Sequence, residues 1–255
     1  MPADLYQFLC LEDNYGVLLH SRNGDVTAAI DAPDADAVMK AIETTGWKLT
    51  HIFCTHHHVD HTAGILRLKQ ETGCTVYAPR REASKIPEVD VQLAGGDAID
   101  FGGLRVEIIE TPGHTLGHIV YHIPSEKLLF AADTLFPLGC GRVFEASMEE
   151  MWRSLQKLMA LDPETVVYCG HEYTSNNARF ALSIEPGNAA LQVRADEVAR
   201  LRRLGRPTVP TTIGLELVTN PFLRPGSREI RERLNMPTQT DAAVFGEIRR
   251  RKDNF

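Results

Sequence analysis

Short apolar runs separated by turn residues dominate the chain as far as residue 172. The runs are rich in β-branched and aromatic side chains and are bounded by Gly, Pro, Asn or Asp, which is the pattern of β-strands. Asn23 and Gly24 mark a tight hairpin turn near the start. The strands that we expect cover residues 5–10, 15–20, 26–31, 49–54, 75–78, 104–110, 116–123, 128–132 and 165–169.

Helical spacing of apolar residues appears between these strands and takes over after residue 172. Ser147 and Glu150 form a capping-box pattern at the start of one helix. The expected helices run from Asp34 or Asp36 to Gly46, and over residues 62–72, 147–160, 176–183, 188–204 and 241–252. We therefore expect an α/β domain over residues 1–172 and a helical domain over residues 173–255.

Composition narrows the class of protein. The 255 residues are 43% hydrophobic and 24% charged, and no apolar run approaches the ~18 residues of a membrane span. Residues 1–4 carry no basic side chain, so a signal peptide is not expected, and we expect a cytoplasmic monomer. The first 172 residues carry a net charge of −12 and the remainder +5, so the acidic part argues against a nucleic-acid partner.

Cysteine usage points away from a disulfide framework. There are five cysteines, an odd number, and none is in Cys-x-x-Cys spacing. We expect them to be small buried apolar residues. Thiolate ligation of a metal by Cys140 or Cys169, which lie near candidate ligand loops, is an alternative.

The most chemically specific stretch is Thr-His-His-His-Val-Asp-His at residues 55–61. It lies between an expected strand and an expected helix. Residues two apart in an extended segment point the same way, so His56 and His58 can converge on one ion. Asp60 and His61 enter a tighter turn and suit a second ion. An expression tag would sit at a terminus and would lack the aspartate.

Three further candidate ligands follow other expected strands: His114, Asp133 and His171. Loops at one edge of a sheet can bring together residues that are far apart in sequence. Seven ligands suit two divalent ions, with three on each ion and one shared carboxylate. The assignment is His56, His58 and His114 on the first ion, Asp60, His61 and His171 on the second, and Asp133 as the bridge.

Such a centre predicts hydrolysis. Metal binding lowers the pKa of water from about 15.7 to about 7, which makes a metal-bridging hydroxide the nucleophile, with Asp60 and Asp133 as the catalytic carboxylates. Two dications, two carboxylates and one hydroxide leave a charge of about +1, which favours an anionic substrate and a developing oxyanion. We therefore expect hydrolysis of an acyl compound rather than redox chemistry.

Four motifs together resemble the metallo-β-lactamase superfamily and, within it, the hydroxyacylglutathione hydrolases, or glyoxalase II. They are the stretch at 55–61, Thr-Pro-Gly-His-Thr at 111–115, Ala-Ala-Asp-Thr-Leu-Phe at 131–136 and Tyr-Cys-Gly-His-Glu-Tyr-Thr at 168–174. The likeness continues through Asn-Pro-Phe-Leu-Arg at 220–224 to Arg-Arg-Arg-Lys-Asp at 249–253. The first motif marks the superfamily, and the C-terminal pieces select glyoxalase II.

The resemblance implies an αββα sandwich of the α/β class, followed by a C-terminal helical domain that binds substrate. It implies hydrolysis of S-(2-hydroxyacyl)glutathione thioesters, such as S-D-lactoylglutathione to D-lactate and glutathione, in methylglyoxal detoxification. Two divalent ions are implied, zinc first, with iron or manganese as alternatives. The family's glutathione contacts fall on Arg142, Phe144, Tyr173, Arg249 and Lys252. Arg142 replaces an expected Lys and keeps the charge, whereas Phe144 replaces an expected Tyr and lacks its hydroxyl.

Other interpretations stay open at this point. A glutathione persulfide dioxygenase with one iron would use fewer of the seven ligands. Another hydrolase of the same fold, a nucleic-acid processing member of the superfamily and a non-catalytic metal-binding module are further alternatives. Two more histidines, His57 and His118, are candidates for donors that orient the ligands.

Overall fold

The computed structural model describes residues 3–255, so residues 1–2 of the expected first domain lie outside the described part of the chain. The chain forms two compact units. Unit 1 comprises the residues up to Thr111 together with Thr115–Phe130, and unit 2 comprises Pro112–His114 together with Ala131–Phe255. This division falls elsewhere than after residue 172, and the domain boundary expected there stays a prediction.

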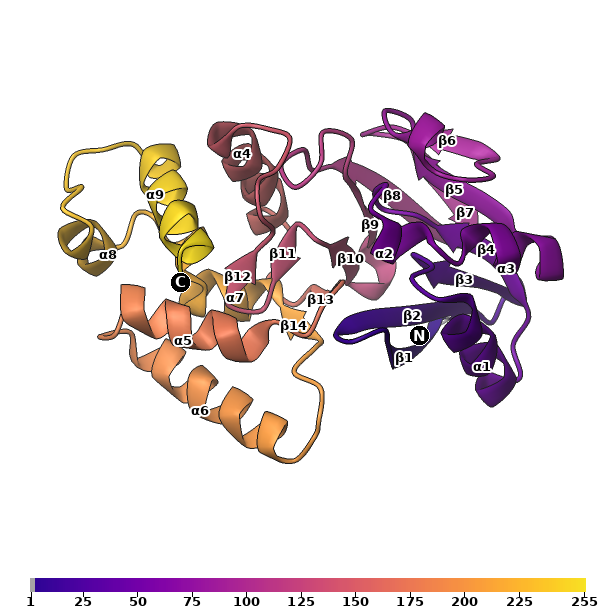
Figure 1. Cartoon of the computed structure of the whole chain (residues 1–255), viewed down its shortest axis with the longest axis horizontal. Coiled ribbons are helices and arrows are strands. Elements are labelled where there is room, and N and C mark those ends of the chain that lie inside the picture. The colour runs from indigo at the N-terminus through magenta and orange to yellow at the C-terminus, as the bar shows by residue number, and fades with distance from the viewer. Residues whose placement is uncertain (1–2) are drawn as a thin grey trace. The chain divides into compact units, whose positions relative to one another are not determined.

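The first sheet of unit 1 has six strands in the order β1-β2-β3-β4-β5-β6 (Figure 1). Strands β1 to β3 pair antiparallel, and β3 to β6 pair parallel. Parallel neighbours need crossover connections, two of which contain helices α1 (Ala35–Thr45) and α3 (Ile65–Thr72). The strands are β1 (Ala3–Cys10), β2 (Asn14–Ser21), β3 (Val26–Ile30), β4 (Leu49–Phe53), β5 (Thr75–Pro79) and β6 (Val91–Leu93).

Helices α1 and α3 form where their sequences predict. The Asp34 carboxylate caps α1 by accepting a hydrogen bond from Ala37 N, and Gly46 ends the helix at φ 73°. The apolar stripes of the two helices pack on the first sheet in one core cluster. Its helical members include Val38, Ala41, Ile65 and Leu68, and its strand members include Leu18, Ala29, Ile52 and Val76.

A second sheet packs face to face with the first inside unit 1. It contains β7 (Ala98–Phe101), β8 (Leu104–Glu110), β9 (Ile119–Ile123) and β10 (Leu128–Ala132), each antiparallel to the next. Aromatic rings fill the space between the sheets. Phe53 stacks on Tyr121 at 5.0 Å between ring centroids and meets Phe101 edge-on at 5.1 Å. The Tyr121 hydroxyl donates to the Cys54 carbonyl at 2.7 Å, which ties the end of β4 to β9.

Strand β10 continues into unit 2, where Gly170 N donates to Ala132 O at 3.1 Å. The sheet of unit 2 continues from there with β13 (Val166–Cys169) and β14 (Thr211–Thr212), and β11 (Leu135–Phe136) pairs with β12 (Gly139–Cys140) in a separate hairpin. The helices of unit 2 are α4 (Met148–Met159), α5 (Thr174–Ile184), α6 (Ala189–Arg203), α7 (Ile213–Thr219), α8 (Arg228–Arg233) and α9 (Asp241–Asp253). Short 3-10 turns are η1 (Ala83–Lys85), η2 (Pro124–Glu126) and η3 (Pro221–Leu223).

The expected elements are confirmed, with two exceptions in their bounds. The helix expected over 62–72 is two helices, α2 (Val59–Thr62) and α3, because Gly64 approaches the preceding loop so closely that a Cβ there would lie 2.8 Å from Ala35 N. The strand expected over 116–123 begins only at Ile119. Helices α7 and α8 were not predicted, and neither were the short strands β6, β7, β11, β12 and β14. Among residues 3–255, no helix has the length and apolar character to cross a membrane.

Candidate metal centre

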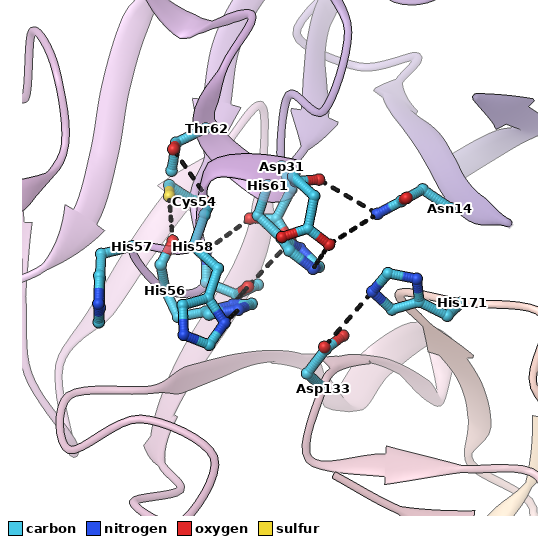
Figure 2. A network of polar contacts seen from close by, with 12 residues as sticks. Asn14, Asp31, Cys54, His56, His57, His58, His61, Thr62, Asp133 and His171 are labelled. Atoms are coloured by element: carbon cyan, nitrogen blue, oxygen red, sulfur yellow. Dashed lines mark hydrogen bonds and ion pairs between the residues drawn. The ribbon is translucent and has the colours of Figure 1, made fainter. Parts of the chain in front are cut away.

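The ligand stretch of unit 1 leaves β4 and enters α2. His58 has extended backbone angles and precedes α2, whereas Asp60 and His61 lie inside this short helix. Two backbone hydrogen bonds hold the stretch against the end of β3: Ala32 N donates to His61 O, and Gly64 N donates to Ala32 O, both at 2.8 Å. Figure 2 shows the side chains of His56, His58 and His61 gathered together. The change from strand to helix therefore separates the four candidate ligands into two pairs.

His56 and His58 present ring nitrogens to a common position. The distance from His56 Nε2 to His58 Nδ1 is 3.2 Å. Two ligands on one tetrahedral zinc ion, with bonds of 2.0–2.1 Å, would lie about 3.3 Å apart. The Thr55 hydroxyl donates to Asp31 at 2.9 Å, so it accepts from His56 Nδ1 at 3.0 Å. This bond places the proton on Nδ1 and leaves the Nε2 lone pair for ligation.

Asp31 is a candidate functional residue that the sequence interpretation missed. Its buried carboxylate accepts from Thr55 N at 2.7 Å and lies 2.8 Å from His61 Nδ1, which orients the ring so that Nε2 can ligate. The residue stands just beyond β3 at φ 57°, a conformation that aspartate tolerates better than most residues. An acidic residue at the end of a buried strand was the available signal, since three predicted ligands share that position.

Asp60 is held by a side chain from the start of strand β2. Asn14 Nδ2 donates to Asp60 O at 3.1 Å and to Oδ2 at 3.4 Å (Figure 2 shows Asn14 reaching toward this turn). The same Oδ2 lies 3.7 Å from His61 Nε2. Asp60 and His61 thus direct ligand atoms toward a common position, as predicted for the second ion.

The three ligands of unit 2 are also together. Asp133 Oδ2 lies 3.5 Å from His114 Nε2 and 3.4 Å from His171 Nε2. The pair of Asp133 and His171 is drawn in Figure 2. His114 Nδ1 donates to Arg142 O at 2.9 Å, which leaves the lone pair of Nε2 for a metal ion. One aspartate oxygen therefore lies near two histidine Nε2 atoms, so Asp133 could hold a metal ion together with either histidine.

The turn that carries Asp133 depends on a glycine. Gly141 lies against this turn, and a Cβ on it would come within 2.0 Å of the Asp133 carbonyl oxygen. Gly141 N donates across the loop to Thr134 O at 3.3 Å. The preceding residue, Ala132, has φ 39°, which is a strained conformation for alanine. The Gly-Cys-Gly sequence of 139–141 therefore permits a backbone approach that places Asp133.

A buried polar network in α7 and η3 holds the hairpin that follows Asp133. Glu216 is fully buried, burial raises its pKa, and it accepts from Leu138 N at 2.7 Å. Asn220 donates from Nδ2 to Phe136 O at 3.2 Å and to Gly139 O at 3.0 Å. The side chain of Asn220, in the motif at 220–224, thus positions the ligand-bearing segment 133–142, a role that sequence reasoning missed.

Two of the predicted substrate residues lie beside ligands of unit 2. The Tyr173 ring stacks on His171 with centroids 4.7 Å apart and planes at 2°. Phe144 is 60% exposed, and its ring centroid lies 5.2 Å from that of His114. Aromatic surface therefore borders both histidines, which suits the exclusion of water from a reacting group.

The basic residues of α9 differ in their exposure. Arg249 is 3% exposed and all its guanidinium nitrogens have protein partners: Nη1 donates to Cys140 O at 2.8 Å, while Nε and Nη2 contact Asp253 at 3.1 and 2.9 Å. Lys252 is half-buried and donates to Asn176 O at 3.2 Å. Burial, followed by the charges of Arg249 and other arginines, lowers the pKa of Lys252 to about 8. Exposed Arg142 lies 3.9 Å from Asp253.

The remaining candidates have ordinary roles or act indirectly. All five cysteines have free, buried thiols, as expected. Burial raises the pKa of Cys140 to about 11 and that of Cys169 well above its ordinary value, so both thiols are protonated in the metal-free chain. His118 stacks on His56 at 4.9 Å, and its Nδ1 lies 3.0 Å from Thr111 Oγ1. His57 pairs with Glu82 at 2.9 Å.

The donor set fits divalent metal by its own chemistry. Nδ1 of His56, His61 and His114 each has an oxygen acceptor, so each ring keeps Nε2 for an ion. Carboxylates accompany the histidines in both units. Such mixed nitrogen and oxygen donors suit Zn, Fe or Mn rather than a hard cation such as Ca²⁺.

Comparisons with known proteins agree with this chemistry. Residues 24–171 match the family model of the metallo-beta-lactamase superfamily, and residues 172–255 match that of the hydroxyacylglutathione hydrolase C-terminus. The hydroxyacylglutathione hydrolase of Rhizobium meliloti (strain 1021) is 56% identical over 252 residues, which is 99% of this chain and 98% of that protein. The protein of the same name from Rhizobium etli is 55% identical and covers 100% of this chain and 99% of its own.

Solved structures share the fold. The crystal structure of ETHE1 from Myxococcus xanthus matches with a TM-score of 0.68 at 25% identity, and the match covers 95% of this chain and 94% of that one. The expected fold class, two sheets with helices and a C-terminal helical region, is thus confirmed. Given both family matches and relatives above 50% identity over nearly their whole length, this chain belongs to the hydroxyacylglutathione hydrolase family of the metallo-beta-lactamase superfamily.

Proposed function

We propose that this chain hydrolyses S-(2-hydroxyacyl)glutathione thioesters, with S-D-lactoylglutathione as substrate in methylglyoxal detoxification. Water adds to the thioester carbonyl carbon, the C–S bond breaks, and the sulfur takes a proton as glutathione leaves from the 2-hydroxy acid. The observation that carries the proposal is Asp133 Oδ2 at 3.5 and 3.4 Å from two histidine Nε2 atoms. Relatives above 50% identity with the hydroxyacylglutathione hydrolase name support the substrate class.

Divalent metal binding follows from membership of the superfamily and from the donor set. We propose two ions, zinc first and iron or manganese as alternatives, held by His56, His58, Asp60, His61, His114, Asp133 and His171. When bound, such ions lower the pKa of water and polarise a carbonyl oxygen.

The chain's own residues prepare this chemistry. Asp31, through His61 and Thr55, and the Arg142 carbonyl, through His114, hold imidazoles in the tautomer that ligates through Nε2. Asp60 and Asp133 bring negative charge that partly offsets the cations and leaves the centre attractive to an anion. We propose these two carboxylates as the catalytic ones.

The glutathione end of the substrate would meet unit 2. We propose that exposed Arg142 and half-buried Lys252 attract its carboxylates, and that Tyr173 supplies a hydroxyl donor beside His171. Phe144 would contribute apolar contact beside His114. Arg249 would act through its charge and by holding the Cys140 loop, because its guanidinium is buried and engaged. The helical region from residue 173 is thereby the proposed substrate-binding domain.

Lys252 predicts an alkaline loss of substrate affinity. Its pKa is lowered to about 8, below the ordinary 10.5, so the positive charge is present at pH 7 and is lost as pH rises through about 8. The kcat/KM for S-D-lactoylglutathione should therefore fall between about pH 7 and pH 9 through a rise in KM. Lys252→Arg, which keeps its charge over this range, should shift this fall to higher pH. An unchanged pH profile in Lys252→Arg would assign the titration to another group.

The proposed activity is tested on one purified sample. Metal content per chain and hydrolysis of S-D-lactoylglutathione should be measured together, before and after removal of metal by a chelator. We expect hydrolysis that disappears on chelation and returns when zinc is restored. Full activity after verified metal removal would contradict the proposal. Oxygen uptake on glutathione persulfide with one iron per chain, and no thioester hydrolysis, would favour the dioxygenase instead.

A further inference from the structure

We propose that Glu82 is a positioning residue for the metal centre, which holds the loop of His56 and His58 in register with the loop that follows His114. The segment 80–91 has no clear periodicity in the sequence. In the structure it follows β5, and its turn places Glu82 between these two loops. The inference rests on the proposed function, because it assumes that the site binds a metal. All the contacts from which it is argued lie within unit 1.

Glu82 is a buried carboxylate with three contacts. Its Oε2 accepts from His57 N at 2.9 Å and lies 2.9 Å from His57 Nδ1, which places the imidazole proton on that nitrogen. Its Oε1 accepts from Gly117 N at 2.7 Å. The residue is only 2% exposed, and a carboxylate at that depth is stable only when donors surround it. One side chain thus joins two loops that are 60 residues apart in sequence.

Predicted ligands lie near both bonded residues in the sequence. His57 lies between His56 and His58, and its own side chain lies apart from theirs in Figure 2. Gly117 follows His114 by three residues. A bond to the His57 backbone limits how the chain can turn between its two neighbours. Glu82 therefore constrains ligands that it does not contact, in the manner of groups that orient metal ligands.

The fit around Gly117 shows that this contact is close. A Cβ at Gly117 would lie 2.6 Å from Glu82 Cγ and 2.9 Å from Arg81 Cβ. Arg81, the residue before Glu82, also donates to the carbonyl oxygen of Leu116, the residue before Gly117, at 3.3 Å. The two segments therefore meet at successive residues, and the bond to Gly117 is part of a packed contact rather than a lone surface interaction.

Glu82→Gln is the sharpest change because it keeps the shape. An amide has one acceptor oxygen and one NH₂ group, whereas the site offers N–H donors to both carboxylate oxygens. The NH₂ group of the glutamine would face the backbone N–H of either Gly117 or His57. Two hydrogen-bond donors would then point at each other, with no acceptor between them. The loops must then separate. Glu88→Gln is the matched control, since Glu88 is an exposed glutamate six residues further along.

The test measures metal affinity without any thioester. Metal-free protein is titrated with Zn²⁺ alone against a competing chelator, and folding of the metal-free protein is checked by circular dichroism. We expect Glu82→Gln to bind zinc at least about tenfold more weakly than the wild type, and Glu88→Gln to bind within about twofold. The Co²⁺ absorption spectrum, which reports ligand geometry, should change in Glu82→Gln alone. Equal zinc affinities and equal spectra in the two variants would overturn the inference.

A second variant decides the case if Glu82→Gln does not fold. His57→Phe keeps a ring and the backbone N–H but removes the side-chain bond to Glu82. We expect His57→Phe to bind zinc more weakly than Glu88→Gln does. The loss should be smaller than that in Glu82→Gln, where that variant folds. A zinc affinity of His57→Phe equal to that of Glu88→Gln would count against the proposal. Wild-type protein that binds zinc but leaves S-D-lactoylglutathione intact would sink the proposed function and leave this inference standing.

Discussion

Asp133→Asn is expected to lower kcat/KM for S-D-lactoylglutathione by at least about 10³-fold, or about 4 kcal/mol of transition-state stabilisation. The side chain keeps its size, so packing is preserved. Its Oδ2 lies between His114 Nε2 and His171 Nε2. An amide would either place NH₂ there, which cannot ligate, or present a neutral oxygen with weaker attraction for cations. It also removes one negative charge from the centre.

The measurement combines turnover with elemental analysis of metal per chain. Asp25→Asn is the matched control, because Asp25 is an exposed residue of the β2–β3 turn and asparagine tolerates its φ of 48°. We expect the control to keep its metal and its activity. If Asp133→Asn keeps both the full metal content and kcat/KM within about tenfold of wild type, Asp133 is not the shared ligand.

Arg249→Ala is expected to destabilise the fold by about 2–3 kcal/mol, a far larger effect than that of its neighbours in α9. Its guanidinium donates to Cys140 O, contacts Asp253, and lies 5.0 Å from the centroid of Phe222. Truncation removes these contacts, leaves the Cys140 carbonyl without this donor and opens a cavity against the ring. Asp253 keeps access to water, which limits the cost.

Urea unfolding of the purified proteins measures this effect. Arg250→Ala is the control, because Arg250 is exposed, pairs with Glu247, and should cost no more than about 0.5 kcal/mol. Lys252→Ala should raise KM with little change in stability. A stable Arg249→Ala with a high KM and unchanged unfolding would instead indicate that the guanidinium binds substrate directly.

Local sequence determined much of the frame. Apolar runs bounded by turn residues specify strands, because successive side chains of a strand point to opposite faces of the sheet. This alternation can be recognised from a few consecutive residues. The capping residues of α1 and α4 act within one turn and were correctly predicted. The helix expected over 62–72 is interrupted at Ala63 and Gly64, because Gly64 packs against Ala32 and Ala35, a contact that no local pattern contains.

The candidate site divides in the same way. Motif spacing identified the metal-binding residue types, since histidine and aspartate clustered at strand ends have few other uses. It did not identify Asp31, Glu82 or Asn220, because each of these side chains acts through hydrogen bonds to a segment that is dozens of residues away in the sequence. Nor could it reveal that Arg249 is buried. Exposure depends on what α9 packs against, and that is a property of the folded chain.

The sequence by itself therefore determined which residues can bind a metal and the family to which the chain belongs. The tertiary structure alone decided which nitrogen of His61 and His114 is left for an ion, because the proton position depends on an acceptor supplied by a distant segment. It also decided the pKa of Lys252, since burial and neighbouring arginines, rather than its place in the sequence, lower this pKa to about 8.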